Sequence, residues 1–232
     1  MKRYIIATGA GVLVGAALVF MFFGLGSWNG PCNHLVREPA NAGVAKKAVR
    51  QYRTSGDWDA SIVCEAEKAK KLLAQYTPAV GEKPAVIFDI DDTALSNWEF
   101  IDITDFGYLH GSYKVWENSA RDSAIKPIQE LYVFAREKGF SIFFITGRRE
   151  VQRASTELNL RKVGFEEWEG VFFKPMDFHG GHAMEYKTKL RANIQSMGYK
   201  IVLNIGDQQS DLDGDPHALY DIKIANPAYF IP

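Results

Sequence analysis

Five apolar runs of strand length constrain the fold of this chain most strongly. They read AVIFDI, FSIFFITG, GVFFK, KIVLNIGD and YDIKIAN, at residues 85–90, 140–147, 170–174, 200–207 and 220–226. Segments with helical spacing of apolar residues lie between the runs, at residues 125–139, 149–163 and 185–197. Strands that are apolar throughout are buried on both faces, and their alternation with helices is typical of a parallel sheet. We therefore expect an α/β fold, a Rossmann-like parallel sheet with helices on both faces.

The pattern divides the 232 residues into three segments. Residues 81–232 carry the strands and form the predicted core. Residues 31–80 read as a helical extension that packs on this core, with two helices separated at SGDWD. Within the core, residues 96–124 are rich in aromatic side chains and exceed the usual strand-to-helix connection of about 2–6 residues. We expect them to form a small insertion over the site.

The first thirty residues are predicted to be a membrane anchor or a signal segment. Residues 4–26 contain no charged side chain and exceed the roughly 20 apolar residues that cross a bilayer. Lys2 and Arg3 precede them, so the positive-inside rule puts everything after residue 30 on the far side of the membrane. We favour an uncleaved anchor, with cleavage as the alternative. Cys32 and Cys64 then lie in an exported chain, where a disulfide and two free thiols both stay open.

The charges are balanced, with 27 Lys and Arg against 28 Asp and Glu and a formal net charge of -1. A nucleic-acid polymer is therefore not an expected partner, because such proteins carry an excess of positive charge. Any anionic substrate must be attracted by a local site.

Polar residues follow three of the predicted strands. Asp89, Asp91 and Asp92 come at the end of the first, Thr146 near the end of the second, and Asp207 at the end of the fourth. The carboxyl ends of parallel strands meet at one edge of a sheet, where ligands bind, so these residues should converge. Crowded carboxylates repel one another and are costly to desolvate. A bound cation or a reacting phosphate would offset that cost.

Four ordered motifs, FDIDDTALSN, FITGR, YKTKLR and NIGDQQSD, resemble those of the haloacid dehalogenase (HAD) superfamily. More narrowly they are similar to its acid phosphatase branch, subfamily IIIB, which includes plant acid phosphatases, vegetative storage proteins and bacterial surface acid phosphatases. The similarity covers roughly residues 40–232, including the ending IANPAYFIP.

The resemblance implies a catalytic role for the aspartates. Asp89 would be the nucleophile that forms an aspartyl-phosphate, and Asp91 the general acid and then the general base. Mg²⁺ would be held by the Asp89 carboxylate, the Asp91 backbone carbonyl and Asp207. Asp211 would orient metal-bound water from a second layer. Asp92, with Thr93, is expected to cap a turn or a helix instead.

The same resemblance assigns phosphate binding to Thr146, Gly147 and Lys187. The threonine hydroxyl and backbone N–H groups at a helix start would hold phosphoryl oxygens, and Lys187 would supply positive charge. Lys189 is the rival for that role. In the insertion, Trp98, Tyr113 and Trp116 are candidate substrate contacts, although a local aromatic core would explain them equally well. His179 and His182 receive no role.

The sequence thus predicts a Mg²⁺-dependent acid phosphatase that hydrolyses small phosphomonoesters such as nucleoside monophosphates. The N-terminal segment and the resemblance together suggest a Gram-negative inner membrane, with the enzyme facing the periplasm, or secretion to the periplasm if the segment is cleaved. Two alternatives remain: a phosphotransferase that uses the same intermediate, and a catalytically weak storage or binding protein.

Overall fold

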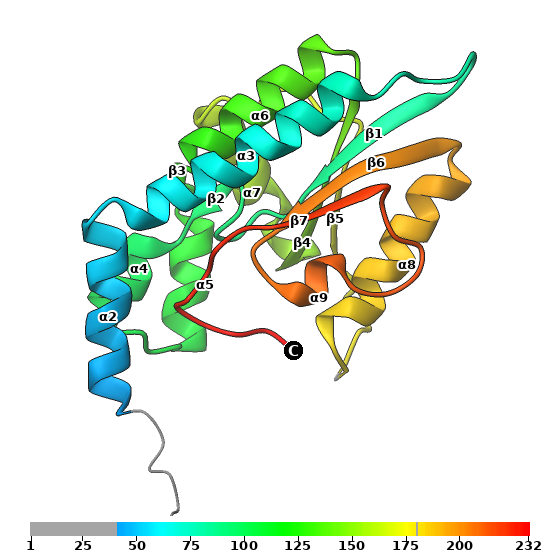
Figure 1. Cartoon of the computed structure of the whole chain (residues 1–232). Coiled ribbons are helices and arrows are strands. Elements are labelled where there is room, and N and C mark those ends of the chain that lie inside the picture. Colours follow the sequence, from blue (N-terminus) through cyan, green and yellow to red (C-terminus); the bar gives the residue numbers. More distant parts are fainter. Residues whose placement is uncertain (1–40, 180) are drawn as a thin grey trace, which may run out of the picture. The chain divides into compact units, whose positions relative to one another are not determined.

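A five-stranded parallel sheet forms the centre of the protein. The computed structural model describes residues 41–179 and 181–232, and the strands lie in the order β5-β4-β1-β6-β7 (Figure 1). Their bounds are β1 Lys83–Phe88, β4 Ser141–Arg149, β5 Gly170–Lys174, β6 Tyr199–Gly206 and β7 Tyr220–Lys223. Each apolar run forms one strand, and the predicted α/β fold is confirmed.

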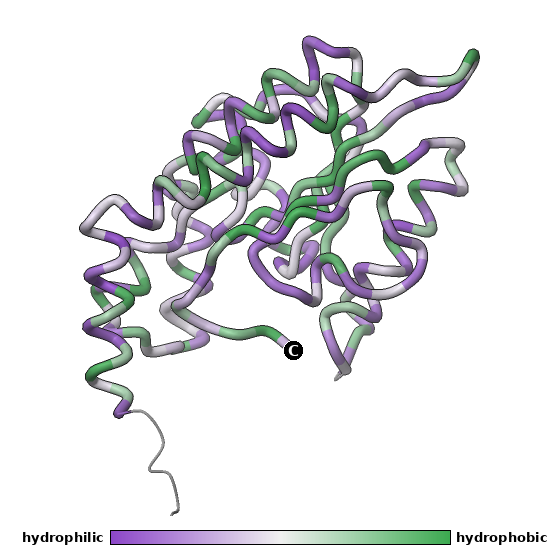
Figure 2. Tube along the Cα trace, viewed as in Figure 1, coloured by the Kyte–Doolittle hydropathy of each residue, from purple (hydrophilic) through white to green (hydrophobic). Residues whose placement is uncertain are grey.

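Helices cover both faces of this sheet. One face carries α3 (Asp57–Gln75), α6 (Lys126–Glu137) and α7 (Arg153–Lys162), and the other carries α8 (Ala183–Ser196) and α9 (Gln209–Leu212). Successive residues of a strand point to opposite faces, so Val86 and Phe88 pack beneath the first group while Ala85 and Ile87 pack against α8. The central strands are correspondingly the most apolar part of the trace in Figure 2.

The helical extension contains two helices, α2 (Ala42–Thr54) and α3. The Asn41 side chain caps α2 by accepting from the backbone N–H of Gly43 at 2.9 Å. The chain then turns at Gly56, whose φ of 88° favours glycine. Ile62, Ala66 and Leu73 of α3 are buried in the core, so this helix belongs to the layer that covers the sheet.

The insertion after β1 is a small lobe made of two short strands and two helices. In chain order these are β2 (Leu95–Ser96), α4 (Trp98–Ile103), α5 (His110–Asn118) and β3 (Ser123–Ala124), and β2 pairs antiparallel with β3. The lobe follows β1 directly and therefore stands beside the carboxyl end of the sheet.

Strand β4 extends further than the sequence suggested. We expected a helix to begin beside Thr146, but β4 continues to Arg149, which pairs with Lys174 of β5. A 3₁₀ turn, η1 (Glu150–Gln152), then leads into α7. Thr146 and Gly147 therefore lie within the end of a strand and not at a helix start.

Within residues 41–179 and 181–232, none of the helices has both the length and the apolar composition needed to cross a membrane. The predicted anchor at residues 1–30 and Cys32 lie outside the described residues. Cys64 is exposed on α3.

Candidate active site

The carboxyl ends of β1, β4 and β6 bring Asp89, Thr146 and Asp207 to one edge of the sheet, as the strand pattern predicts. The backbone N–H of Asp89 donates to the carbonyl of Ile205 at 2.9 Å, which joins the tip of β1 to β6. All three side chains are buried, and Asp89 is only 6% exposed. Their positions therefore depend on the sheet itself and not on a mobile loop.

Asp89 contacts the ammonium group of Lys187, which lies on α8, one of the helices that cover the sheet. Nζ of Lys187, on α8, lies 2.6 Å from Oδ1 of Asp89. No described side chain donates to Oδ2 of Asp89, which leaves that oxygen open to a ligand. Burial raises the pKa of Asp89 well above its usual value, Lys187 opposes this shift, and Asp211 and Asp207 add to it.

Three buried aspartates form an acidic cluster around this point. Carboxylate oxygens of Asp89, Asp207 and Asp211 all lie within 4.8 Å of one another. Asp207 accepts from Thr93 Oγ1 at 3.1 Å and from Asn226 Nδ2 at 2.6 Å. Burial, followed by the charge of Asp211, raises the pKa of Asp207 to about 7. Three neighbouring carboxylates with one lysine carry excess negative charge.

The protein itself occupies both carboxylate oxygens of Asp211. Oδ1 accepts from Lys187 Nζ, and Oδ2 accepts from the backbone N–H of Gln208 at 2.9 Å. A Cβ at Gly206 would collide with this carboxyl group, so the close approach requires glycine there. Asp211 is thus held firmly at the edge of the cluster, and its second-layer role stays a prediction.

The acidic cluster fits a divalent cation such as Mg²⁺. Its donors are carboxylate oxygens, which are the ligands that hard cations prefer. Burial and then the neighbouring carboxylates raise the pKa values of Asp89 and Asp207, and a cation would relieve this repulsion. The third predicted ligand is the backbone carbonyl of Asp91, which is near the Asp89 carboxylate in the chain because only one residue separates the two.

The carboxylate of Asp91 is not one of the three in this cluster and pairs with Arg148. Nη2 of Arg148 lies 2.7 Å from Oδ1 of Asp91, and Nε lies 3.2 Å from Oδ2. Asn97 Nδ2 also donates to Oδ1, at 3.0 Å. Burial alone would raise the pKa of Asp91, but the charge and hydrogen bonds of Arg148 outweigh it and lower the pKa below its usual value.

Arg148 is fully buried and is shared by further carboxylates that the sequence analysis missed. Its Nη2 lies 2.9 Å from Oδ2 of Asp122, and its Nε lies 3.8 Å from Oε1 of Glu117. Burial is the main cause that raises the pKa of Asp122 to about 6 and that of Glu117 to about 7. The motif FITGR contains this arginine, so the sequence could have suggested that it has a role. The sequence could not show that the side chain points into the protein, because its partners Asp122 and Glu117 lie far from it along the chain.

Thr146 lies near the end of β4 and Lys187 lies on α8, and both side chains approach the aspartates. Oγ1 of Thr146 is 3.5 Å from Oδ2 of Asp91 and accepts from the backbone N–H of Arg148 at 3.0 Å. Gly147 is exposed beside them at the strand end. Lys189, the rival of Lys187, is exposed and makes no described contact with the aspartates. Of the two lysines, only Lys187 reaches the cluster.

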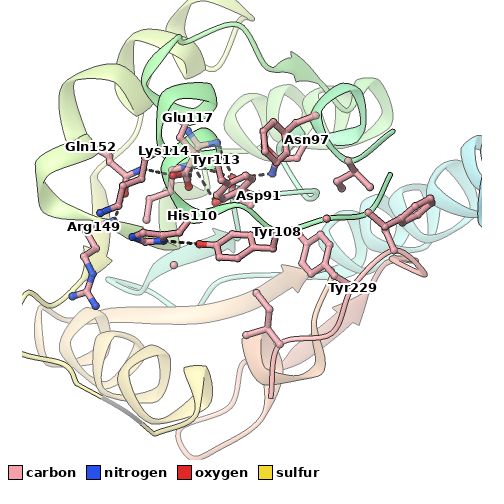
Figure 3. A pocket seen from close by; sticks show the side chains of 18 of the residues that line it. Asp91, Asn97, Tyr108, His110, Tyr113, Lys114, Glu117, Arg149, Gln152 and Tyr229 are labelled. Carbon is pink, nitrogen blue, oxygen red and sulfur yellow. Dashed lines mark hydrogen bonds and ion pairs between the residues drawn. The ribbon is translucent and has the colours of Figure 1, made fainter. Parts of the chain in front are cut away.

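A cavity of about 510 Å³ opens beside Asp91 (Figure 3). The insertion lines it with Tyr108 and Tyr113, and the C-terminal segment lines it with Tyr229. Of the three aromatic residues predicted to contact substrate, only Tyr113 lines this cavity. Trp98 packs against Phe106 and under the guanidinium of Arg53, while the buried Trp116 packs against Phe100 and donates to Asn97. The structure therefore gives these two tryptophans packing contacts.

Asp92 holds the turn that carries the insertion. Its Oδ1 accepts from the backbone N–H of Asn97 at 2.9 Å, and its Oδ2 accepts from Tyr229 Oη at 2.8 Å. Asp92 thus caps a turn, as expected, and also fixes the C-terminal segment over the site. His179 and His182 are exposed, and His182 stands at the start of α8.

Comparison with known proteins identifies the family. The model of the HAD superfamily, subfamily IIIB (acid phosphatase), matches residues 36–232. Acid phosphatase 1 of Solanum lycopersicum is 34% identical over 79% of this chain and 73% of its own length. Vegetative storage protein 2 of Arabidopsis thaliana is 31% identical over 79% and 68%. A stem 31 kDa glycoprotein of Glycine max is 36% identical, and the match spans 59% of its length.

The fold has a solved counterpart as well. The class C acid phosphatase of Bacillus anthracis, solved with tungstate bound, superimposes with a TM-score of 0.65 over 82% of this chain and 86% of its own, at 24% identity. The family match and the relative named acid phosphatase support a phosphomonoesterase, as the motifs predict. The chain belongs to the HAD superfamily, subfamily IIIB, the acid phosphatases.

Proposed function

We propose that this protein is a Mg²⁺-dependent acid phosphatase that hydrolyses small phosphomonoesters through an aspartyl-phosphate at Asp89. The observation that carries the proposal is the position of Asp89. Its Oδ2 is open while Lys187 binds its Oδ1, and two further buried aspartates stand within 4.8 Å. The nucleophile thus lies beside a lysine that can neutralise phosphoryl oxygens and beside carboxylates that can hold a cation, as phosphoryl transfer requires.

In the first step, Oδ2 of Asp89 attacks phosphorus and the bond to the leaving oxygen breaks. Lys187, Thr146 and the backbone at Gly147 bind the transferring phosphoryl oxygens. Asp89, Asp207 and the Asp91 carbonyl would hold Mg²⁺, which supplies positive charge that shields the carboxylate from the phosphate dianion. Asp211 keeps Lys187 in place through its hydrogen bond.

Asp91 supplies the proton chemistry in both steps. In its protonated form it donates a proton to the leaving oxygen, and its carboxylate then takes a proton from the water that attacks the aspartyl-phosphate. Because Arg148 outweighs burial and lowers the pKa of Asp91, the protonated form is populated at acidic pH. Arg148 and Asn97 hold this carboxylate at 2.7 Å and 3.0 Å. The carboxylate also borders the cavity that can receive the leaving group. This proximity supports the role of Asp91 toward the leaving group.

Nucleoside monophosphates are the substrates we favour within the monoester class. The cavity combines aromatic walls, from Tyr113 and Tyr229, with polar side chains, and aromatic rings pack well against flat heterocycles.

On residues 1–30 alone, we propose an anchor in a bacterial inner membrane with the enzyme facing the periplasm.

A storage function is the second candidate, because two relatives carry the name vegetative storage protein. The predicted nucleophile, acid and lysine are all present in this chain, with Lys187 2.6 Å from Asp89 and Asp91 two residues further along. A protein used only for storage has no need for this arrangement. Enzymatic hydrolysis is therefore favoured over storage.

Hydrolysis by the full-length chain of an aryl phosphate whose aryl group is uncharged tests the proposal. Activity should require Mg²⁺, disappear with a chelator, and fall below detection in Asp89→Asn. Asp213→Asn is the control, because the Asp213 carboxylate accepts from Gln209 and from no other described residue. Hydrolysis without added metal, or equal activity in both variants, would contradict the mechanism. No turnover across a panel of monoesters would favour storage.

A further inference from the structure

Two cations stand side by side on the cavity wall. Arg149 ends β4 and Lys174 ends β5, and their Cα atoms are partners in the parallel register of the two strands. Both residues line the cavity of about 510 Å³ that also borders Asp91, and Figure 3 labels Arg149 there. The roles proposed above use neither residue.

The guanidinium of Arg149 is held in position with hydrogen-bond donors to spare. Its Nη1 donates to the carbonyls of Pro175 and Met176, at 3.2 Å and 3.4 Å. Neither its Nε nor its Nη2 donates to a described residue. An arginine fixed in this way presents a planar set of N–H groups suited to a carboxylate or phosphate.

Neither cation has an acidic partner among residues 41–179 and 181–232. No described carboxylate lies within 4.0 Å of Arg149 or Lys174, whereas Arg148 next in the chain contacts three. Burial, followed by the charge of Arg149, lowers the pKa of Lys174. Two adjacent like charges repel, and an anion bound between them would remove that cost. Glu117, which also lines the cavity, is already bound by Gln152.

The cavity lies on the side of the leaving group. Asp91, the proposed proton donor to the leaving oxygen, lines it, but Asp89, Asp207 and Lys187 do not. A group that fills the cavity is therefore the part of the substrate beyond the scissile bond.

We propose that Arg149 and Lys174 bind a second anionic group on the leaving group. Within the monoester class, nucleotides included, esters whose alcohol also carries a carboxylate or a phosphate are then preferred over esters of a neutral alcohol. This inference rests on the proposed function, since it assumes that Asp91 faces the leaving oxygen.

Matched substrates test this inference. The two esters are 4-(carboxymethyl)phenyl phosphate and 4-(carbamoylmethyl)phenyl phosphate, which differ in charge but little in shape. We expect the ratio of their kcat/KM values to favour the carboxylate about tenfold or more in the wild type, as for a charge-assisted pair. Lys174→Met and Arg149→Met should each reduce this ratio about tenfold. Lys114→Met removes another cation of the same cavity and should leave the ratio unchanged.

Three outcomes would overturn the assignment. The first is a wild-type ratio of kcat/KM near one. The second is an equal fall in kcat/KM for both esters in Lys174→Met and Arg149→Met. The third is a fall of the ratio in Lys114→Met as large as in those two variants. The second outcome would mean that Arg149 and Lys174 bind the transferring phosphate. The third would mean that the total positive charge of the cavity, and not this pair, favours the anionic ester.

Binding of the product alcohols separates this inference from the proposed function, because it needs no turnover. The wild type should bind 4-hydroxyphenylacetate more tightly than 4-hydroxyphenylacetamide, and Lys174→Met should lose the difference. Such binding without hydrolysis of either ester would refute the proposed function but keep the anion site. Equal binding of both alcohols would refute the site.

Discussion

Arg148 holds Asp91 through both carboxylate oxygens, with Nη2 at 2.7 Å from Oδ1 and Nε at 3.2 Å from Oδ2. The arginine side chain is fully buried and that of Asp91 is 18% exposed. This two-point contact fixes the direction of the proposed proton donor. It also makes one guanidinium responsible for compensating three neighbouring carboxylates.

Arg148→Met should therefore lower both stability and activity. Removing the cation leaves Asp91, Glu117 and Asp122 without compensation, which costs about 3–5 kcal/mol for a buried pair. A displaced Asp91 should also reduce kcat by about 100-fold. Denaturant unfolding and steady-state kinetics measure the two effects. Arg153→Met, which breaks surface pairs with Glu150 and Glu157, should cost less than about 1 kcal/mol. An Arg148 variant as stable as this control would refute the account.

Glu117 should make the protein less stable as the pH rises. Burial, followed by the charge of Asp91, raises its pKa to about 7 in the folded state, so between about pH 4.5 and 7 the folded protein holds more protons than the unfolded chain. The free energy of unfolding then falls through this range.

Glu117→Gln removes that titration. It should change stability little at pH 5 but raise it relative to the wild type at pH 8, by roughly 1–3 kcal/mol. Urea unfolding at both pH values gives the comparison, with the exposed Glu130→Gln as a control that shows no such gain. A constant difference between wild type and Glu117→Gln at both pH values would rule out the titration.

Lys187 and Lys189 offer a matched pair on one helix. Lys187→Met removes the ammonium group 2.6 Å from Asp89, and we expect kcat to fall about 100- to 1,000-fold, as for loss of a group that stabilises developing charge. Lys189→Met should retain wild-type activity because Lys189 is exposed. Equal losses, measured with the same aryl phosphate, would remove Lys187 from the phosphate site.

The sequence predicted the strands and the aspartates at their ends, because both follow from local patterns. Asp89 and Asp207 meet because β1 and β6 are neighbours in the sheet, and Asp211 joins them from α9. The inward direction of Arg148 was not predictable, since Asp122 and Glu117 reach it from the insertion. Trp98 and Trp116 were candidate substrate contacts on composition alone, and only packing showed that Tyr113 lines the cavity.

Gly206→Ala should displace Asp211. The added Cβ would collide with Cβ and a carboxylate oxygen of Asp211, and relief of this overlap should cost about 1–3 kcal/mol. Because Asp211 also binds Lys187, kcat should fall as well. Gly111→Ala is the control, since a Cβ there meets no atom within 4 Å and alanine favours the helix. Unchanged stability and kcat in Gly206→Ala would show that Asp211 is not tightly packed there.

The most direct test of the central claim is to trap the phosphorylated enzyme. The full-length chain, mixed with Mg²⁺ and a rapidly cleaved aryl phosphate, is quenched in acid within milliseconds and mapped by mass spectrometry. We predict one added phosphoryl group on the peptide that contains Asp89, absent when Mg²⁺ is chelated and absent in Asp89→Asn. A phosphoryl group on another residue, or steady turnover with none trapped on Asp89, would contradict the account.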